Sequence, residues 1–328
     1  IPDHTTGIRL VLDALTHPEH GVISSLDELK AAGHRVAHGG EFFTDSCLVD
    51  DEVKAKIESL YSIAPLHNPA NLEGILSMEK VLPGIKQVAV FDTSFHHTIP
   101  AINYLYAVPY EYYEKYRVRK YGFHGTSHKF VARVGAEMFG LDFENSKIVT
   151  CHIGNGASVT AIKNGKSFDT SMGFSPVDGL VMGTRCGDID PAVAMFIMNK
   201  EGLTPDEMNN IMNKKSGVLG VSGVSSDDRD IEKAIGEGNE RAKLAYDMLC
   251  YQIKKFIGAY SASMGGLDAI VFTAGIGENN YSLREAVCEG MDFYGIEIDK
   301  ERNKNFTRGI PFDITKEGAR VATWIIPT

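Results

Sequence analysis

Five short segments of the sequence place charged or imidazole side chains beside glycine or proline. They are residues 38–40, 65–69, 91–97, 122–128 and 183–188. Glycine lets the backbone approach a ligand closely, and a charged side chain between glycines is poorly placed to serve a hydrophobic core. Five such segments in one chain favour an active site over a set of unrelated loops.

Two further segments are rich in glycine and follow apolar runs that are typical of strands. Residues 152–156 read His-Ile-Gly-Asn-Gly, and residues 274–279 read Ala-Gly-Ile-Gly-Glu-Asn. Backbone N–H groups in a glycine-rich turn, or at the start of a helix that follows one, are suited to bind phosphate. The sequence therefore predicts two phosphate-binding segments, the second of which is a glycine loop before a helix.

Four charged or imidazole residues suggest what happens to that phosphate. Arg35 and Arg185 lie in glycine-containing segments, Asp92 ends a predicted strand, and His124 lies between glycines. Arginine neutralises a carboxylate and stabilises the charge on a migrating phosphoryl group. Histidine donates to the same oxygens, and aspartate orients a nucleophile or holds Mg²⁺ through water. These residue types favour phosphoryl transfer to an anionic acceptor.

Each of these residues also has an ordinary structural interpretation. Asp92 could cap a helix, and Arg35 and Arg185 could form structural ion pairs. Asn155 could form no more than a turn, and residues 275–277 are a weak motif by themselves. The histidines could include metal ligands, but their spacing matches no common metal motif, so we expect most of them to be ordinary hydrogen-bonded side chains.

Alternating helix and strand patterns predict an α/β fold that positions these segments. Helical spacing of apolar residues predicts helices over 50–64, 71–82 and 239–264 and a helix that starts near Ser282, with the long helix ending at 265–266. Its predicted inward residues are Leu244, Met248, Ile253, Phe256 and Tyr260. Strands are predicted over 87–91, 147–151, 158–162 and 268–273, and 164–165 predicts a type I′ hairpin turn.

Composition narrows the class of protein. The 328 residues suggest about two domains, and 43% hydrophobic with 23% charged residues is typical of a globular protein. A net charge of −10 is not typical of a protein that binds nucleic acid, and no apolar run approaches the length that a membrane span needs. The start shows no signal peptide, and five cysteines without a CxxC pair fit reduced thiols. We expect a cytoplasmic protein that binds neither nucleic acid nor membrane.

Seven longer motifs, taken in order, resemble the acetokinase family. They are residues 64–69, 90–96, 119–128, 150–156, 182–191, 214–220 and 272–279, and the resemblance extends from residue 33 to residue 328. It implies a two-domain α/β fold of the actin and sugar-kinase type, the acetate and sugar kinase superfamily, with the active site in the interdomain cleft. Residues 1–97 would form the first domain, on the acyl-substrate side, and 98–328 the nucleotide-binding domain. The segment 94–145 could pack with either.

The resemblance also implies the reaction. It is reversible transfer of a phosphoryl group from ATP, with Mg²⁺, to acetate, which gives ADP and acetyl phosphate; propionate kinase is the alternative. A homodimer in the cytoplasm is implied as well. Two hypotheses of other classes stay open, a metal-dependent hydrolase built on the histidine and aspartate residues and a non-catalytic nucleotide-binding module.

Site residues carry over from the family motif by motif. Arg35 would hold the acyl substrate, Asp92 would be the catalytic acid/base-type residue, and His124 and Arg185 would stabilise the transition state. The acyl group would contact Arg35, Ala37, Leu66 and Phe123. The nucleotide would contact His152, Ile153, Gly154, Asn155, Gly156, Asp227, Asp228, Arg229, Gly275, Ile276, Gly277, Glu278 and Asn279.

Departures from the family pattern qualify these expectations. The family's opening Asn-x-Gly-Ser-Ser-Ser-x-Lys loop and its Asn-Glu-Glu segment after Ile-Pro-Thr are not in this sequence. The expected Asn and Glu metal ligands thus lie outside it, and our hypothesis is a fragment with weak or no kinase activity alone. Asp228 replaces a usual Phe, which puts its adenosine contact in doubt. Ala37 stands where Val is frequent in the family, and the smaller side chain leaves room for about one more methylene on the acyl group. One methylene discriminates between acetate and propionate by only about 1–3 kcal/mol.

Overall fold

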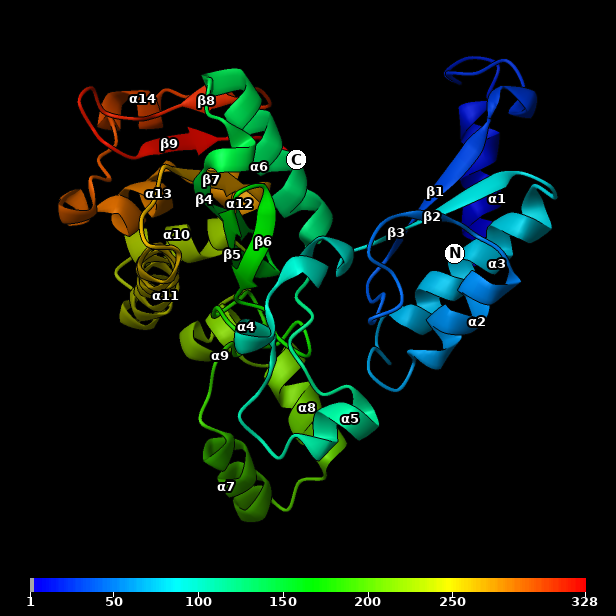
Figure 1. Cartoon of the computed structure of the whole chain (residues 1–328), viewed down its shortest axis with the longest axis horizontal. Coiled ribbons are helices and arrows are strands. Elements are labelled where there is room, and N and C mark those ends of the chain that lie inside the picture. The colour runs from blue at the N-terminus through cyan, green and yellow to red at the C-terminus, as the bar shows by residue number, and fades with distance from the viewer. Residues whose placement is uncertain (1–2) are drawn as a thin grey trace. The chain divides into compact units, whose positions relative to one another are not determined.

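The computed structural model describes residues 3–328. The chain divides into two compact units, Ile1–His97 and Thr98–Thr328, and Figure 1 colours the first blue to cyan. Each unit has its own β-sheet with helices packed on it, so the predicted α/β fold is confirmed. Within residues 3–328, no helix is long and apolar enough to cross a membrane.

The sheet of the first unit has three strands. They are β1 (Ala31–Val36), β2 (Cys47–Leu48) and β3 (Lys86–Phe91), in the order β1-β3-β2. Strands β1 and β3 run parallel, with Val36 opposite Phe91, and β2 is antiparallel to β3. Parallel pairing brings the carboxyl ends of β1 and β3 to the same edge, which positions the residues that follow them.

Three helices complete the first unit: α1 (His4–Leu15), α2 (Asp51–Ser59) and α3 (Asn68–Val81). The helix predicted over 50–64 is too long, because the chain turns after Ser59, although Leu60 and Ala64 are buried in that turn. Helix α3 begins earlier than the predicted residue 71, because Pro69 fits the first helical turn.

The second unit contains a six-stranded sheet in the order β6-β5-β4-β7-β9-β8. Its strands are β4 (Lys147–Ile153), β5 (Ala157–Lys163), β6 (Lys166–Thr170), β7 (Ala269–Thr273), β8 (Phe312–Asp313) and β9 (Ala322–Ile325). Strands β4, β7 and β9 are parallel, and the remaining pairs are antiparallel. Asn164 and Gly165 join β5 to β6 with φ of +53° and +72°, as the type I′ prediction requires.

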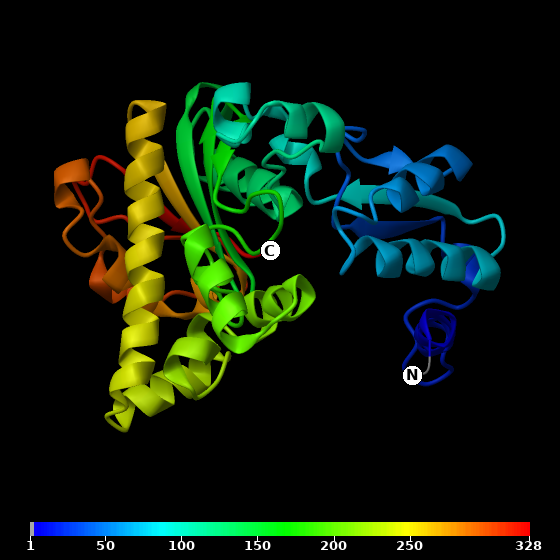
Figure 2. The same cartoon turned by 90° about the horizontal axis from the view of Figure 1, so that it is seen from below.

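Helices α6 (Gly125–Phe139) and α11 (Glu240–Met264) pack on opposite faces of this sheet. The other helices of the unit are α4 (Ala101–Tyr104), α5 (Glu111–Tyr116), α7 (Pro191–Glu201), α8 (Pro205–Lys214), α9 (Gly217–Ser222), α10 (Asp228–Gly236), α12 (Ala274–Asn279), α13 (Tyr281–Cys288) and α14 (Lys300–Lys304). Side chains of β4 alternate between the two faces. Val149 and Cys151 join the core cluster with α11, whereas Thr150 and His152 bond to α6. Figure 2 shows α11 running along its face of the sheet.

Helix α11 matches the predicted span, but its inward row differs. Ile253 and Tyr260 are buried as predicted, and Met248 and Phe256 are partly buried, whereas Leu244 is 53% exposed. The buried row at that end runs instead through Ala242 and Ala245, whose small side chains pack against α9. The prediction for Leu244 was therefore wrong, because the largest apolar residue is not the one that faces the neighbouring helix.

The glycine segment after β7 is not a loop. Residues 274–279 form the short helix α12 directly after the strand, and α13 begins at Tyr281. The Glu278 carboxylate accepts a hydrogen bond from the N–H of Ala274 at 2.9 Å and so ties the two ends of α12 together. Helix α12 lies against β4, and a Cβ at Gly277 would be in ordinary van der Waals contact with the Cys151 carbonyl oxygen, at 3.4 Å.

Candidate active site

Arg35 and Asp92 form a tight ion pair in the first unit. Arg35 Nε donates to Asp92 Oδ1 at 3.0 Å and Nη2 donates to Oδ2 at 2.5 Å. The Asp92 side chain is 4% exposed and the Arg35 side chain 69%. Hydrogen bonding to Asp92 raises the pKa of Arg35. Asp92 thus pairs with an arginine and does not cap a helix. Arg35 does form the ion pair that its structural interpretation predicted.

The loop that follows β1 is fixed from two sides. Asn68 exchanges two hydrogen bonds with the backbone of His38, at 3.1 and 3.0 Å. Asn71 Oδ1 accepts from the N–H of Ala37 at 2.9 Å, and Thr93 Oγ1 accepts from the next glycine of the loop at 2.9 Å. The sequence analysis did not predict these three positioning residues, although Asn68 and Thr93 lie inside the family motifs 64–69 and 90–96.

The residues predicted to surround the acyl group are spread over both units. Ala37 is buried and Leu66 is exposed in the first unit. Phe123 belongs to the second unit, where it is buried in the core cluster around β4. The shared pocket of these three residues stays a prediction.

Histidines of the second unit gather near β4 and bond to hydroxyl side chains. His124 Nδ1 and His128 Nε2 both lie within hydrogen-bonding distance of Ser158 Oγ, at 2.9 and 2.7 Å. His152 Nδ1 pairs with Ser127 Oγ at 2.8 Å, and the His124 and His152 rings stack at 4.1 Å. In the part of the chain that the structure describes, no group of three or more His, Cys, Asp or Glu side chains could hold a metal ion.

His124 and Arg185 converge on Gly156, at the end of the first glycine segment. A Cβ at Gly156 would lie 3.2 Å from Arg185 Nη1 and 3.7 Å from His124 Cε1 and Nε2. Because Nδ1 of His124 is turned toward Ser158, its Nε2 edge faces this space. The structure therefore brings together three of the predicted site residues, while their roles in catalysis stay predictions.

Arg185 differs from an ordinary structural arginine. Its described contact is with Met182 Sδ at 3.8 Å, and no carboxylate within residues 3–328 pairs with it. Burial lowers its pKa. A half-buried guanidinium without a counter-ion is costly, and an anionic ligand offsets that cost.

The segment that carries Arg185 is fixed by close backbone contacts. Gly183 donates to the Asn155 carbonyl oxygen at 3.0 Å, and a Cβ on Gly183 would lie only 1.8 Å from Asn155 Oδ1. Val218 donates to the Met182 carbonyl oxygen at 2.8 Å, and a Cβ on Gly217 would be 2.1 Å from the same oxygen. Glycine is therefore required at 217, where φ is +64° and the close atom belongs to the backbone, whereas a side chain at 183 would displace the Asn155 amide. These contacts hold the Arg185 segment against the glycine turn.

A pair of carboxyl groups, which we did not predict, lies at the two ends of the same segment. Tyr106 donates to Asp178 Oδ2 at 3.1 Å, and the N–H of Gly179 donates to Asp188 Oδ1 at 2.7 Å. Burial, together with the neighbouring Asp188 carboxyl group, raises the pKa of Asp178 to about 6. These carboxylates do not neutralise Arg185, whose pKa shift has burial as its cause.

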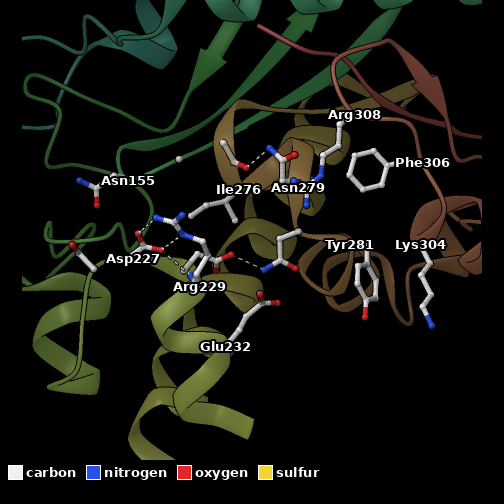
Figure 3. Close-up of a pocket in the computed structure, with 15 residues that line it drawn as sticks. Asn155, Asp227, Arg229, Glu232, Ile276, Asn279, Tyr281, Lys304, Phe306 and Arg308 are labelled. Atoms are coloured by element: carbon white, nitrogen blue, oxygen red, sulfur yellow. Dashed lines mark hydrogen bonds and ion pairs between the residues drawn. The ribbon is translucent and has the colours of Figure 1, made fainter.

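A cavity of about 920 Å³ holds many of the predicted nucleotide contacts, as Figure 3 shows. The predicted residues that line it are Gly154, Asn155, Asp227, Asp228, Arg229, Gly275, Ile276 and Asn279. They come from the turn after β4, the start of α10, and α12. The volume is typical of a site for a small organic ligand.

In the wall of this cavity, Arg229 and Asp227 form an ion pair with each other. Arg229 Nη2 donates to Asp227 Oδ2 at 2.6 Å and Nε donates to Oδ1 at 3.0 Å. Asp227 also caps α10 by accepting from the Arg229 N–H at 2.9 Å. Hydrogen bonds from Arg229 lower the pKa of Asp227 to about 2.

The other predicted nucleotide residues do not line this cavity. They are His152, Ile153, Gly156, Gly277 and Glu278. Ile153 is buried in the core, and Glu278 accepts from the N–H groups of Ala274 and Thr328 at 2.9 and 3.1 Å. Their observed contacts shape the strand end and α12, and direct contact with a nucleotide stays a prediction for them.

Seven lining residues were not predicted. They are Ser226, Glu232, Asn280, Tyr281, Lys304, Phe306 and Arg308. Asn280 and Tyr281 directly follow the glycine segment, and Glu232 lies one helical turn after Asp228, so their spacing was an available signal. The last three lie in or just after α14, where no motif pointed to a ligand.

Known proteins similar to this chain form one consistent group. The model of the acetokinase family matches residues 1–328. An acetate kinase from Caldicellulosiruptor saccharolyticus is 56% identical over 328 residues, which cover 100% of this chain and 82% of that protein.

Solved structures give the same result. An acetate kinase from Porphyromonas gingivalis superposes with a TM-score of 0.95 at 52% identity, over 100% of this chain and 82% of the other. A propionate kinase from Francisella tularensis subsp. tularensis gives 0.91 at 39% identity, over 99% and 81%. The similarity thus extends over the whole of this chain in sequence and in fold.

Proposed function

Because the chain belongs to the acetokinase family, we propose that it is an ATP-dependent carboxylate kinase that phosphorylates acetate to acetyl phosphate. The reaction is reversible, with ADP as the second product. The two sets of site residues, around Arg35 in the first unit and around Arg185 in the second, serve this one reaction.

The observation that carries the proposal is the unpaired Arg185 beside His124 at the glycine turn. Two hydrogen-bond donors, one of them a cation without a carboxylate partner, converge on a backbone that has no side chain at Gly156. Charge on a phosphoryl group spreads over its three equatorial oxygens during transfer. Donors fixed in place before the reaction stabilise that charge without reorganisation.

The acceptor end is assigned to Arg35. Asp92 uses Nε and Nη2 of this guanidinium, and the arginine side chain is otherwise largely exposed, so its Nη1 edge is available for a carboxylate. Acetate is already ionised at neutral pH, so the nucleophile does not need a general base. Asp92 then acts on the reaction by orienting Arg35, and the acid/base-type role that the family resemblance implies for it stays a prediction.

We propose that Mg²⁺ enters with the nucleotide. When bound there, it neutralises charge on the β- and γ-phosphate oxygens. We assign to the described residues the binding and orientation of the two substrates and the donation of hydrogen bonds to the phosphoryl group.

Two further properties are proposed with the activity. Helix α7 buries none of its residues, and Met195 and Phe196 are 57% and 60% exposed, so we infer that a second copy of the chain covers it. Light scattering should show a dimer that Phe196→Asp dissociates; a monomeric wild-type chain would contradict this.

The five cysteines are all free, which suits the reducing cytoplasm.

Hydroxylamine trapping of the acyl phosphate tests the function. With ATP and Mg²⁺, the chain extended by the family's opening loop and its Asn-Glu-Glu segment should form acyl hydroxamate from acetate, and from propionate if Ala37 leaves the room expected of it, whereas the chain alone should form little. Binding of ADP should be measured on the same samples. Nucleotide binding without product would favour a non-catalytic module, and acetate-independent hydrolysis with a tightly bound transition metal would favour a hydrolase.

A further inference from the structure

Two histidines at the start of α6 face one serine. His124 immediately precedes the helix and His128 follows one turn later, so their side chains lie on the same face. Both rings reach Ser158 Oγ of β5, His124 through Nδ1 at 2.9 Å and His128 through Nε2 at 2.7 Å. The other nitrogen of His128, Nδ1, lies 2.6 Å from Thr150 Oγ1 of β4. Thr150, His128, Ser158 and His124 thus form one row of hydrogen bonds, here called the hydroxyl–histidine row.

This row is buried except at its His124 end. Its three inner members are each 0% exposed, whereas His124 is half-buried. Nε2 of His124 lies, with Arg185 Nη1, beside the position that a side chain at Gly156 would occupy. The row therefore begins in the core, at Thr150, and ends at the space assigned to the phosphoryl group.

The number of protons in the row allows two directions of donation. The Ser158 hydroxyl has no other partner among the described residues, so it donates its one proton to one imidazole and accepts from the other. Burial disfavours a charged imidazole, so His128 is neutral, with one nitrogen that donates and one that accepts. Either every donor points from Thr150 toward His124, or every donor points the opposite way.

The Thr150 end decides between the two directions. Within residues 3–328, the Thr150 hydroxyl makes a single hydrogen bond, the one with His128 Nδ1. If His128 donated to Thr150, the buried hydroxyl proton of Thr150 would have no acceptor, which destabilises the fold. If Thr150 donates, every buried proton of the row has an acceptor. Thr150 then donates to Nδ1 of His128, Nε2–H of His128 donates to Ser158, and Ser158 donates to Nδ1 of His124.

We propose that Thr150, His128 and Ser158 are positioning residues that keep the proton of His124 on Nε2, from which the ring donates a hydrogen bond to the phosphoryl group. The catalytic consequence rests on the proposed function, whereas the direction of the row does not. The hydrogen bond at one nitrogen of a histidine sets which nitrogen carries the proton. In the opposite direction, Nε2 of His124 would present a lone pair to an anionic oxygen and repel it.

Nitrogen NMR of the chain labelled with nitrogen-15 histidine tests the direction without turnover, because protonated and unprotonated ring nitrogens differ in chemical shift. At pH 8, His124 and His128 should each show a protonated Nε2 and an unprotonated Nδ1. Thr150→Val keeps the shape of the side chain but removes the first donor, and Ser158→Ala removes the link to His124. In both variants His124 should become a mixture of tautomers, whereas Thr150→Ser should keep the single wild-type tautomer.

Thr160→Val is the matched control. Thr160 lies opposite Thr150 on β5, is equally buried, and bonds to Thr170 instead of a histidine. This variant should leave the tautomers of both histidines unchanged. A proton on Nδ1 of either ring in the wild type would overturn the proposal. An unchanged His124 tautomer in either Thr150→Val or Ser158→Ala, or the same change in Thr160→Val, would overturn it as well.

The catalytic consequence is measured on the extended chain of the hydroxylamine assay. Ser158→Ala should lower kcat about tenfold or more while the KM for ATP stays within about twofold, because the donor is mispositioned in the transition state. Thr150→Val should behave alike, and Thr150→Ser should restore kcat. Equal kcat in Ser158→Ala and wild type would refute the catalytic role. An inactive extended wild type would refute the proposed function and that role together, whereas the NMR result would still decide the direction of the row.

Discussion

The two arginines singled out in the sequence occupy opposite environments. Arg35 is mostly exposed, yet two of its nitrogens are bonded to the buried Asp92. Arg185 is more enclosed, and no described carboxylate neutralises it. A paired arginine already has its charge balanced, so an anion at its remaining edge gains a hydrogen bond but relieves no uncompensated charge. An unpaired, desolvated arginine gains most when negative charge appears beside it.

This difference assigns the two residues to different stages of the reaction. In the proposed reaction, the Arg35 pair is a preformed docking point for an acceptor that arrives ionised and loses its carboxylate charge as the new P–O bond forms. We proposed that Arg185 faces the position at which charge develops, and its contribution should then be larger in the transition state than in the ground state. Mutations at the two positions should therefore affect different kinetic constants.

The largest expected effect is that of Arg185→Ala on kcat. Loss of the unpaired guanidinium should lower kcat by about a thousandfold or more, with a KM for ATP within a fewfold of wild type. Initial rates at varied ATP give both constants. An unchanged kcat would refute the transition-state role, and Arg185→Lys should restore part of the rate, because a point charge lacks the planar fork.

Arg35→Ala should act chiefly on the acceptor. We expect the KM for acetate to rise about ten- to a hundredfold, because a charge-assisted hydrogen bond to the carboxylate is lost. The KM for ATP should stay near the wild-type value. If acetate saturation were normal in this variant, the assignment of the acceptor to Arg35 would be wrong.

The pH dependence of the free energy of unfolding tests whether ionised Asp178, buried in the segment around Arg185, destabilises the folded state. The pKa of Asp178 rises from 3.8 to about 6 on folding, so protonation of Asp178 favours the folded state. Its stabilising contribution is complete below pH 4 and is lost as the pH rises through 6. Asp178→Asn cannot ionise, so it should be more stable than wild type at pH 8, by up to roughly 3 kcal/mol.

Urea unfolding of wild type and Asp178→Asn between pH 4 and pH 8 measures that difference. It should vanish at pH 4, where the wild-type carboxyl group is protonated. The exposed Asp206→Asn serves as control and should follow wild type throughout. A constant difference between Asp178→Asn and wild type at every pH would show that packing, and not ionisation, is responsible.

The smallest predicted effect concerns Ala37, next to the acceptor arginine. Ala37 is buried and its N–H is fixed by Asn71, so a larger side chain should take space from the acyl group. Ala37→Val should shift the kcat/KM ratio toward acetate over propionate by roughly tenfold, within the 1–3 kcal/mol that a methylene provides. An unchanged ratio would place the acyl pocket elsewhere.

Local features were predictable from the sequence. The strands over 87–91 and 268–273, the Asn164–Gly165 turn and the end of α11 at Gly265 follow from propensities that act over a few residues. Glycine spacing likewise pointed to the turn at Gly156 and to the wall of the cavity formed by α12.

Features that depend on packing were not predictable. Both arginines lie in glycine-rich contexts, and the sequence does not show which of them finds a carboxylate. Leu244 was placed inward because it is large, but the contact with α9 is made by small alanines. Phe306 and Arg308 line the cavity from a loop after α14, which is distant in sequence from the glycine segments, so no local motif marks them.

The most direct test of the contrast between the arginines uses a transition-state analogue. ADP with aluminium fluoride and acetate imitates the phosphoryl group during transfer, whereas ADP alone imitates the ground state. We predict that Arg185→Ala weakens binding of the complete analogue at least a hundredfold while ADP affinity changes less than threefold. Equal loss for both ligands, or no loss for either, would contradict the account.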